Sequence, residues 1–143
     1  MKALPLWQPW ASLVALGAKR VETRHWKAPE SLIGQRIAIH ATKTARELWI
    51  ADTEPFRTHL RCLDSPLPLG AIVATVVLKR CCVMTSEGIT LLRQHHPDEY
   101  AFGNYAVDRF AWVLAEVIRL DTPVAFKGSQ GIFAVPDDLI WGA

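Results

Sequence analysis

Apolar residues between positions 9 and 16 recur at the three- and four-residue spacing of a helix. One side of this segment, which includes Trp10, is therefore expected to pack on a core. Pro9 suits the first turn of a helix, and Gly17 is a typical residue just beyond a helix end. The pattern predicts a helix from position 9 to about position 16.

Five later segments have the pattern of β-strands. Residues 35–41 alternate clearly, with Ile37 and Ile39 on one face and His40 on the other. Residues 71–84 form a long apolar run, which is typical of a strand that is buried on both sides or bent around a barrel. The other predicted strands are residues 19–26, 109–120 and 131–135.

Short helices are predicted between these strands. The first begins near Thr42 or Thr44 and is expected to carry Trp49 into the core, where Trp112 is also expected. No repeat, low-complexity tract or linker divides the chain, so we expect one domain over residues 1–143. The fold class is α+β: a small, partly closed β-barrel of about five to six strands with helices at its rim. The remaining helical segments are expected after Pro55, over residues 85–95 and at residues 136–141.

Composition narrows the class of protein. The chain has 143 residues, of which 50% are hydrophobic, and no stretch approaches the roughly 20 apolar residues of a membrane span. The N-terminal segment lacks the apolar core of a secretory signal, so a soluble, cytoplasmic protein without a membrane partner is expected. Its histidines and three cysteines have no ligand spacing, which predicts no metal, no cofactor and buried, reduced thiols. The cysteines are Cys62, Cys81 and Cys82.

Charge is distributed unevenly along the chain. Residues 1–46 carry eight lysines and arginines against two glutamates, whereas the whole chain has a net charge of only +2. A basic half is compatible with an anionic partner such as phosphate or nucleic acid. The alternative, in which the folded chain mixes these charges over its surface, is equally open.

The densest charge follows directly after the first predicted helix. Lys19, Glu22 and Arg24 crowd beside an apolar segment, where charged groups are costly unless they are paired or used. Lys19 can bind phosphate as a point charge and Arg24 as a bidentate fork. Glu22 can orient a ligand amine or act as a base. The alternative is a structural ion pair between Glu22 and Arg24 or Arg20.

A second candidate is the loop from Lys127 to Gly131, which offers a cation, a hydroxyl on Ser129, the amide of Gln130 and two glycines. Such a loop can cradle an anion, although a plain tight turn explains it about as well. His40 and Lys43 lie at a predicted strand end. His40 can act as an acid, a base or a phosphate donor, but satisfying a backbone carbonyl is the commoner role.

Two tryptophans flank the charged segment. Trp10 and Trp26 can stack on a nucleobase, as aromatic side chains do on single-stranded RNA. Packing beneath the charged strand is the stronger interpretation for Trp10, and Trp26 remains open.

These motifs resemble a known family. Gln8-Pro9-Trp10-Ala11 followed by Gly17-x-Lys19-x-x-Glu22-x-Arg24 is similar to the signature of the ASCH domain, a branch of the PUA-like superfamily. Residues 37–41, 105–114 and 127–131 resemble later blocks of that family. The resemblance implies a β-barrel, a cleft between barrel and helices, and a role with RNA or nucleosides.

The residues and the resemblance together favour RNA or nucleotide binding in a basic cleft between the charged segment and the 127–131 loop. The alternatives are hydrolases: a ribonuclease, or an amidohydrolase acting on acylated nucleosides. In the latter branch a threonine stands where this chain has Glu22, so its triad is not carried over. The sequence does not decide the oligomeric state, for which a monomer and a weak dimer are the two alternatives. Candidate catalytic residues are Lys19, Glu22 and Ser129; candidate ligand-binding residues are Trp10, Arg24, Trp26, His40, Lys43, Lys127 and Gln130.

Overall fold

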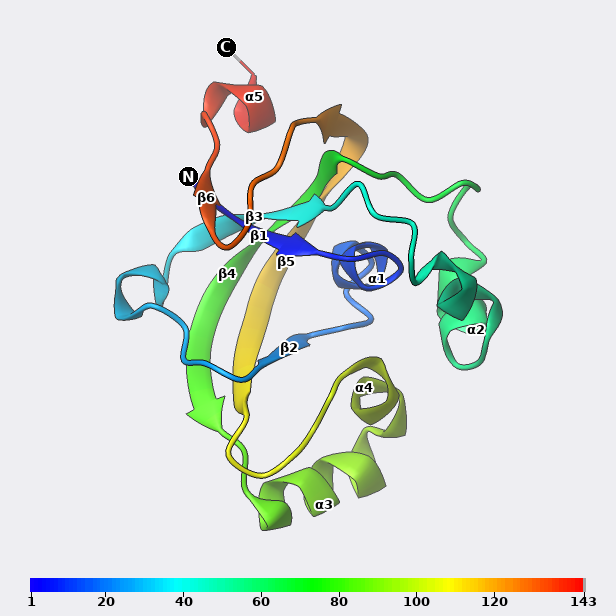
Figure 1. The fold of residues 1–143 in the computed structure, drawn as a ribbon, viewed down its shortest axis with the longest axis vertical. Coiled ribbons are helices and arrows are strands. Elements are labelled where there is room, and N and C mark those ends of the chain that lie inside the picture. The colour runs from blue at the N-terminus through cyan, green and yellow to red at the C-terminus, as the bar shows by residue number, and fades with distance from the viewer. Residues whose placement is uncertain (143) are drawn as a thin grey trace.

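The computed structural model describes residues 1–142, and its framework is one six-stranded sheet with short helices around it (Figure 1). The strands are β1 Lys2–Leu6, β2 Val21–Arg24, β3 Arg36–Ala41, β4 Ala71–Val83, β5 Phe110–Ala125 and β6 Phe133–Ala134. The α-helices are α1 Trp10–Ala15, α2 Phe56–Leu60, α3 Ser86–His95, α4 Pro97–Phe102 and α5 Asp138–Trp141. Two 3-10 helices span Glu30–Leu32 and Leu48–Asp52.

The strand order across the sheet is β2-β5-β4-β3-β1-β6. Only the β1–β3 pair is parallel, and the other four pairs are antiparallel. The sheet is mixed and is not closed, so the predicted partly closed barrel is matched only roughly. Irregularities in the β4–β5 pairing, at three places along the ladder, explain the bend of these two long strands in Figure 1.

Helix α1 confirms the first prediction and forms the centre of the core. Its residues 11–15 are all buried, between the sheet and α2. The chain leaves the helix through Gly17, whose φ is +76°, and Ala18 N donates to Leu13 O at 3.0 Å. This left-handed turn is typical of a helix C-terminus that needs glycine.

Other predicted elements are confirmed with changed bounds. The strands expected at 35–41 and 71–84 are present, whereas β5 continues to Ala125, beyond the end predicted at position 120. Helix α3 confirms the prediction at 85–95, and Thr85 caps it by accepting a hydrogen bond from Gly88 N. Strand β1 and helix α4 were not predicted.

Two predictions of buried side chains are wrong. Trp49 is 63% exposed, because the segment expected to be an amphipathic helix is a 3-10 helix without a buried residue. Cys62 and Cys82 are exposed free thiols, and only Cys81 is partly buried. Trp112 is fully buried, as expected. No helix within residues 1–142 is both long enough and apolar enough to cross a membrane.

Candidate functional site

A cleft of about 1130 Å³ opens beside the second half of β1. Strand β6 pairs with Lys2 and Ala3, so among residues 1–142 no strand lies on that side of Pro5 and Leu6 at the end of β1. Proline is tolerated there because it has no N–H to give to a ladder. The other walls are residues 22–26, the end of β3 with residues 42–44, residues 101–104 at the end of α4, and residues 128–131.

Eight of the ten predicted site residues line this cleft. Residues 22–26 and residues 128–131, which the sequence predicted to converge, form two of its walls. Lys19 and Lys127 are outside the set of lining residues. The eight lining residues are Trp10, Glu22, Arg24, Trp26, His40, Lys43, Ser129 and Gln130.

Glu22 and Arg24 form a close ion pair in the cleft wall. Arg24 Nε donates to Glu22 Oε2 at 2.8 Å, and Arg24 Nη2 donates to Pro5 O at 3.0 Å. The second carboxylate oxygen, Glu22 Oε1, accepts from Thr23 N at 3.2 Å. The guanidinium also lies 5.7 Å from the centre of the Trp26 ring. This geometry fixes Arg24 across the gap between β1 and β2, with its charge compensated.

Lys19 is buried behind the cleft wall and is only 2% exposed. Its ammonium donates to Val21 O at 2.6 Å and to Phe102 O at 3.3 Å, and it lies 3.7 Å from Glu22 Oε1. Burial lowers the pKa of this ammonium, and the charges of Glu22 and Glu99 partly offset that effect. Lys19 therefore ties β2 to the end of α4.

Helix α4 and the segment after it bring two further, partly buried ionisable groups to this junction. Glu99 Oε1 accepts from Arg20 N at 2.7 Å, and burial raises the pKa of the Glu99 carboxyl. Burial also raises the pKa of the Tyr105 hydroxyl, and the carboxylates of Glu99 and Glu22 add to the shift. Within residues 1–142, Glu99 Oε2 and the Tyr105 hydroxyl have no hydrogen-bond partner.

His40 lies in the cleft wall with 1% of its surface exposed. Its Nε2 is 2.7 Å from Phe126 O, so this nitrogen carries the hydrogen and donates. The ring meets Phe133 edge-on at 5.3 Å between centroids. Gly128 packs against the imidazole so closely that a Cβ there would be 2.6 Å from His40 Cε1. Glycine at position 128 is required by this close approach.

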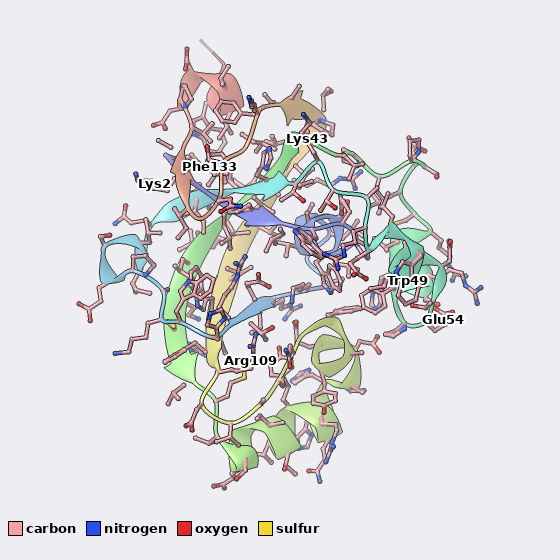
Figure 2. All side chains as sticks on the ribbon, in the orientation of Figure 1. Lys2, Lys43, Trp49, Glu54, Arg109 and Phe133 are labelled. Carbon is pink, nitrogen blue, oxygen red and sulfur yellow. The ribbon has the colours of Figure 1, made fainter. Side chains whose placement is uncertain are left out.

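Exposed aromatic and cationic side chains surround the opening. Trp26 is 45% exposed and Trp7 is 41% exposed, and Arg46 lies 5.8 Å from the centre of the Trp7 ring. Figure 2 shows Lys43 beyond the end of β3 and Arg109 before the start of β5, on opposite sides of the molecule's centre. Both cations line the cleft.

Sequence reasoning missed the wall formed by residues 101–104. Asn104 N donates to Thr23 Oγ1 at 3.0 Å, and Arg109 Nε donates to Asn104 O at 2.9 Å. These contacts fix the segment after α4 against β2, and α4 was itself not predicted. Trp7 was missed as well, although a tryptophan directly before the Gln8-Pro9-Trp10 motif was a signal that could have found it. Among the described residues, no three His, Cys, Asp or Glu side chains are grouped so that they could hold a metal ion.

The fold and the cleft define a small α+β domain whose site lies between an open sheet and short helices. The ASCH domain family model matches residues 4–124, and the chain belongs to this family. No curated protein matches the sequence.

The structure is similar to the crystal structure of ASCH from Zymomonas mobilis, with a TM-score of 0.59, 15% identity, and coverage of 99% of this chain and 91% of that one. A tyrosine-to-phenylalanine variant of that protein gives a TM-score of 0.57, with 15% identity and coverage of 96% and 91%. A serine-to-alanine variant gives 0.56, with 15% identity and coverage of 96% and 89%. At this level of identity the likeness shows a shared fold.

Proposed function

We propose that the cleft binds single-stranded RNA or a nucleotide derived from it. The observation that carries this proposal is the convergence of eight predicted site residues, from separate parts of the sequence, on one cleft of about 1130 Å³. A volume of this order exceeds what a single drug-sized ligand needs. Membership of the ASCH family supports the same class of ligand.

The chemistry of the cleft matches the two parts of a nucleotide. Exposed Trp26 and Trp7 offer flat faces on which bases stack, an interaction worth about 1–3 kcal/mol per base. Lys43 and Arg109 supply cations for the phosphates. Arg24 is already paired with Glu22, so its role is to order the wall and to support the Trp26 ring rather than to hold a phosphate.

Hydrolysis of RNA or of acylated nucleosides has weaker support. The Lys19 ammonium is buried and donates to two carbonyl oxygens. Both oxygens of Glu22 accept hydrogen bonds from neighbours. Ser129 is in the cleft wall, but within residues 1–142 no hydrogen bond links its hydroxyl to a base. Turnover of either substrate class by the wild-type protein would reverse this ranking.

Binding is tested by fluorescence anisotropy with short, end-labelled single-stranded RNA. The Trp26→Ala variant is expected to weaken binding by about five- to 150-fold, since it removes a stacking face worth about 1–3 kcal/mol. Trp49→Ala is the matched control, because Trp49 is 63% exposed and does not line the cleft. A wild-type protein without affinity for RNA or nucleotides, or equal affinities for the two variants, would contradict the proposal.

A further inference from the structure

A second cavity of about 340 Å³, which we call the side pocket, adjoins the cleft. We propose that the side pocket receives one nucleobase of the bound strand, while the sugar-phosphate chain stays in the cleft. This inference rests on the proposed nucleotide binding and names where a base is held. The residues that line both cavities are Pro5, Arg24, Trp26 and Gly131.

The rim of the side pocket is accessible to a ligand. Trp26 is 45% exposed, and Ile132 is half-buried. Pro29 and Gly131 are exposed. All four residues line the side pocket, so a base can enter between them without contacting the buried residues beneath.

The lining of the side pocket favours an uncharged, flat group. Among the described residues that form it, Arg24 alone is charged, and its guanidinium already donates to Glu22 Oε2 and to Pro5 O. The other lining residues are two tryptophans, two prolines, a leucine, an isoleucine and a glycine. A phosphate that entered would lose water and would meet only a cation whose charge Glu22 compensates. A nucleobase is uncharged and has flat faces that stack on aromatic rings, so it is the part of an RNA strand that fits this lining.

The size of the side pocket limits what it can hold. Its volume of about 340 Å³ is near the lower end of the roughly 300–1,000 Å³ range of ligand pockets, whereas the cleft has about 1130 Å³. The side pocket therefore suits one base, and the cleft suits the longer chain. Because the two cavities share lining residues, the base that enters remains connected to a strand in the cleft.

Trp26 is held in place where the two cavities meet. Trp112 Nε1 donates to Trp26 O at 3.2 Å. The Arg24 guanidinium lies 5.7 Å from the centre of the Trp26 ring and 6.0 Å from that of the Trp112 ring. His25, which lines the cleft, meets the Trp26 ring edge-on at 4.2 Å between centroids. A side chain that is already ordered loses little freedom when a base packs against it.

The test is an isotope-filtered NOE experiment on the wild-type protein with labelled isoleucine methyl groups, saturated with octauridylate. Ile132 lines the side pocket but not the cleft, so NOEs between its methyl protons and the ring protons of uracil are expected. Ile33 is the internal control, because it is 36% exposed and lines neither cavity. A bound complex without NOEs between Ile132 and uracil, or with equal NOEs to Ile33, would overturn the inference.

Two matched variants give an independent measurement. Ile132→Ala is expected to weaken octauridylate binding by about fourfold or more, the value of one buried methylene group, and Ile33→Ala is expected to bind like the wild type. An octamer of abasic ribose phosphates, which keeps the backbone charge, is expected to bind Ile132→Ala and the wild type equally. Thermal unfolding verifies that each variant is folded. Equal octauridylate affinities of the two variants, or an equal loss for the abasic octamer, would overturn the inference.

The failure of this inference is distinguishable from the failure of the proposed function. If the wild-type protein does not bind octauridylate, the proposed binding of single-stranded RNA is wrong, and the side pocket fails with it. If octauridylate binds and Trp7→Ala weakens it, but Ile132 shows no contact with uracil, the cleft binds RNA and the side pocket takes no base.

Discussion

Lys19 connects the sequence motif to the cleft without lining it. Its ammonium holds two backbone carbonyls and lies 3.7 Å from Glu22, which in turn holds Arg24 at 2.8 Å. Glu22 and Arg24 both line the cleft, and Arg24 is the member of this series that also lies against the Trp26 ring. The spacing of the three charges thus serves to position one guanidinium, and the structural ion pair considered from the sequence is present.

Glu99 gives this junction a pH dependence. Its pKa is raised by burial above the value of 4.5 expected in the unfolded chain. Between these two pKa values the folded state binds more protons than the unfolded state, so Glu99 makes the free energy of unfolding fall as pH rises. In urea unfolding, Glu99→Gln is therefore expected to gain stability relative to the wild type as pH increases above 4.5.

The control for this prediction is Glu87→Gln, because Glu87 is an exposed residue in the first turn of α3. The same measurement on this variant gives the effect of removing a carboxylate that stays exposed when the chain folds. A stability difference between Glu99→Gln and the wild type that does not change with pH would mean that Glu99 ionises alike in both states.

At the scale of elements, the turn after α1 determines where β2 begins. Gly17 has a φ of +76°, and a Cβ there would have room, since its nearest contact is Val117 Cγ1 at 3.6 Å. The cost of Gly17→Ala therefore comes from the backbone, and is expected to be about 1–2 kcal/mol in the free energy of unfolding. Urea unfolding measures it.

Asparagine tolerates left-handed backbone better than alanine, so Gly17→Asn is expected to lose clearly less stability. Equal losses in the two variants would point to a steric cause in place of the backbone conformation.

The elements that the sequence predicted well have strong local signals. Helix α1 has its proline and glycine at the two ends, and β3 has a clear alternation. Strand β1 lacked such a signal, because Pro5 lies in a five-residue strand and depends on parallel pairing with β3. Helix α4 has only six residues and is stabilised by Phe102 packing on α2, a contact that no local pattern contains.

The same distinction applies to the site. Glu22, Arg24 and the 128–131 segment were predicted from charge and loop composition, and all line the cleft. The buried position of Lys19 could not be predicted, because it follows from Phe102 and Glu99 on α4. Residues far apart in sequence decide which charges are buried and which remain accessible.

For the whole molecule, the cations that line the cleft come from both the basic first third and the later chain. Lys43 and Arg109 are the examples in Figure 2. RNA affinity is expected to fall as salt rises, because bound cations release counterions from the phosphates. Lys43→Ala is expected to reduce the slope of log affinity against log salt by about 0.7, the value for one phosphate contact on a single strand.

Lys79→Ala provides the matched loss of charge, since Lys79 is exposed on β4 and does not line the cleft. Its slope is expected to equal that of the wild type. If both lysine variants lower the slope equally, RNA affinity depends on the total charge of the protein and not on the cations of the cleft.

Strand β6 is only two residues long, and in the part of the chain that the structure describes it leaves Leu4 to Leu6 of β1 without a strand partner on that side. The cleft opens at this place because β6 ends after two residues. Each residue by which a relative lengthens this strand would narrow the opening by about 3.3 Å along β1. The length of this one short strand therefore sets the width of the opening.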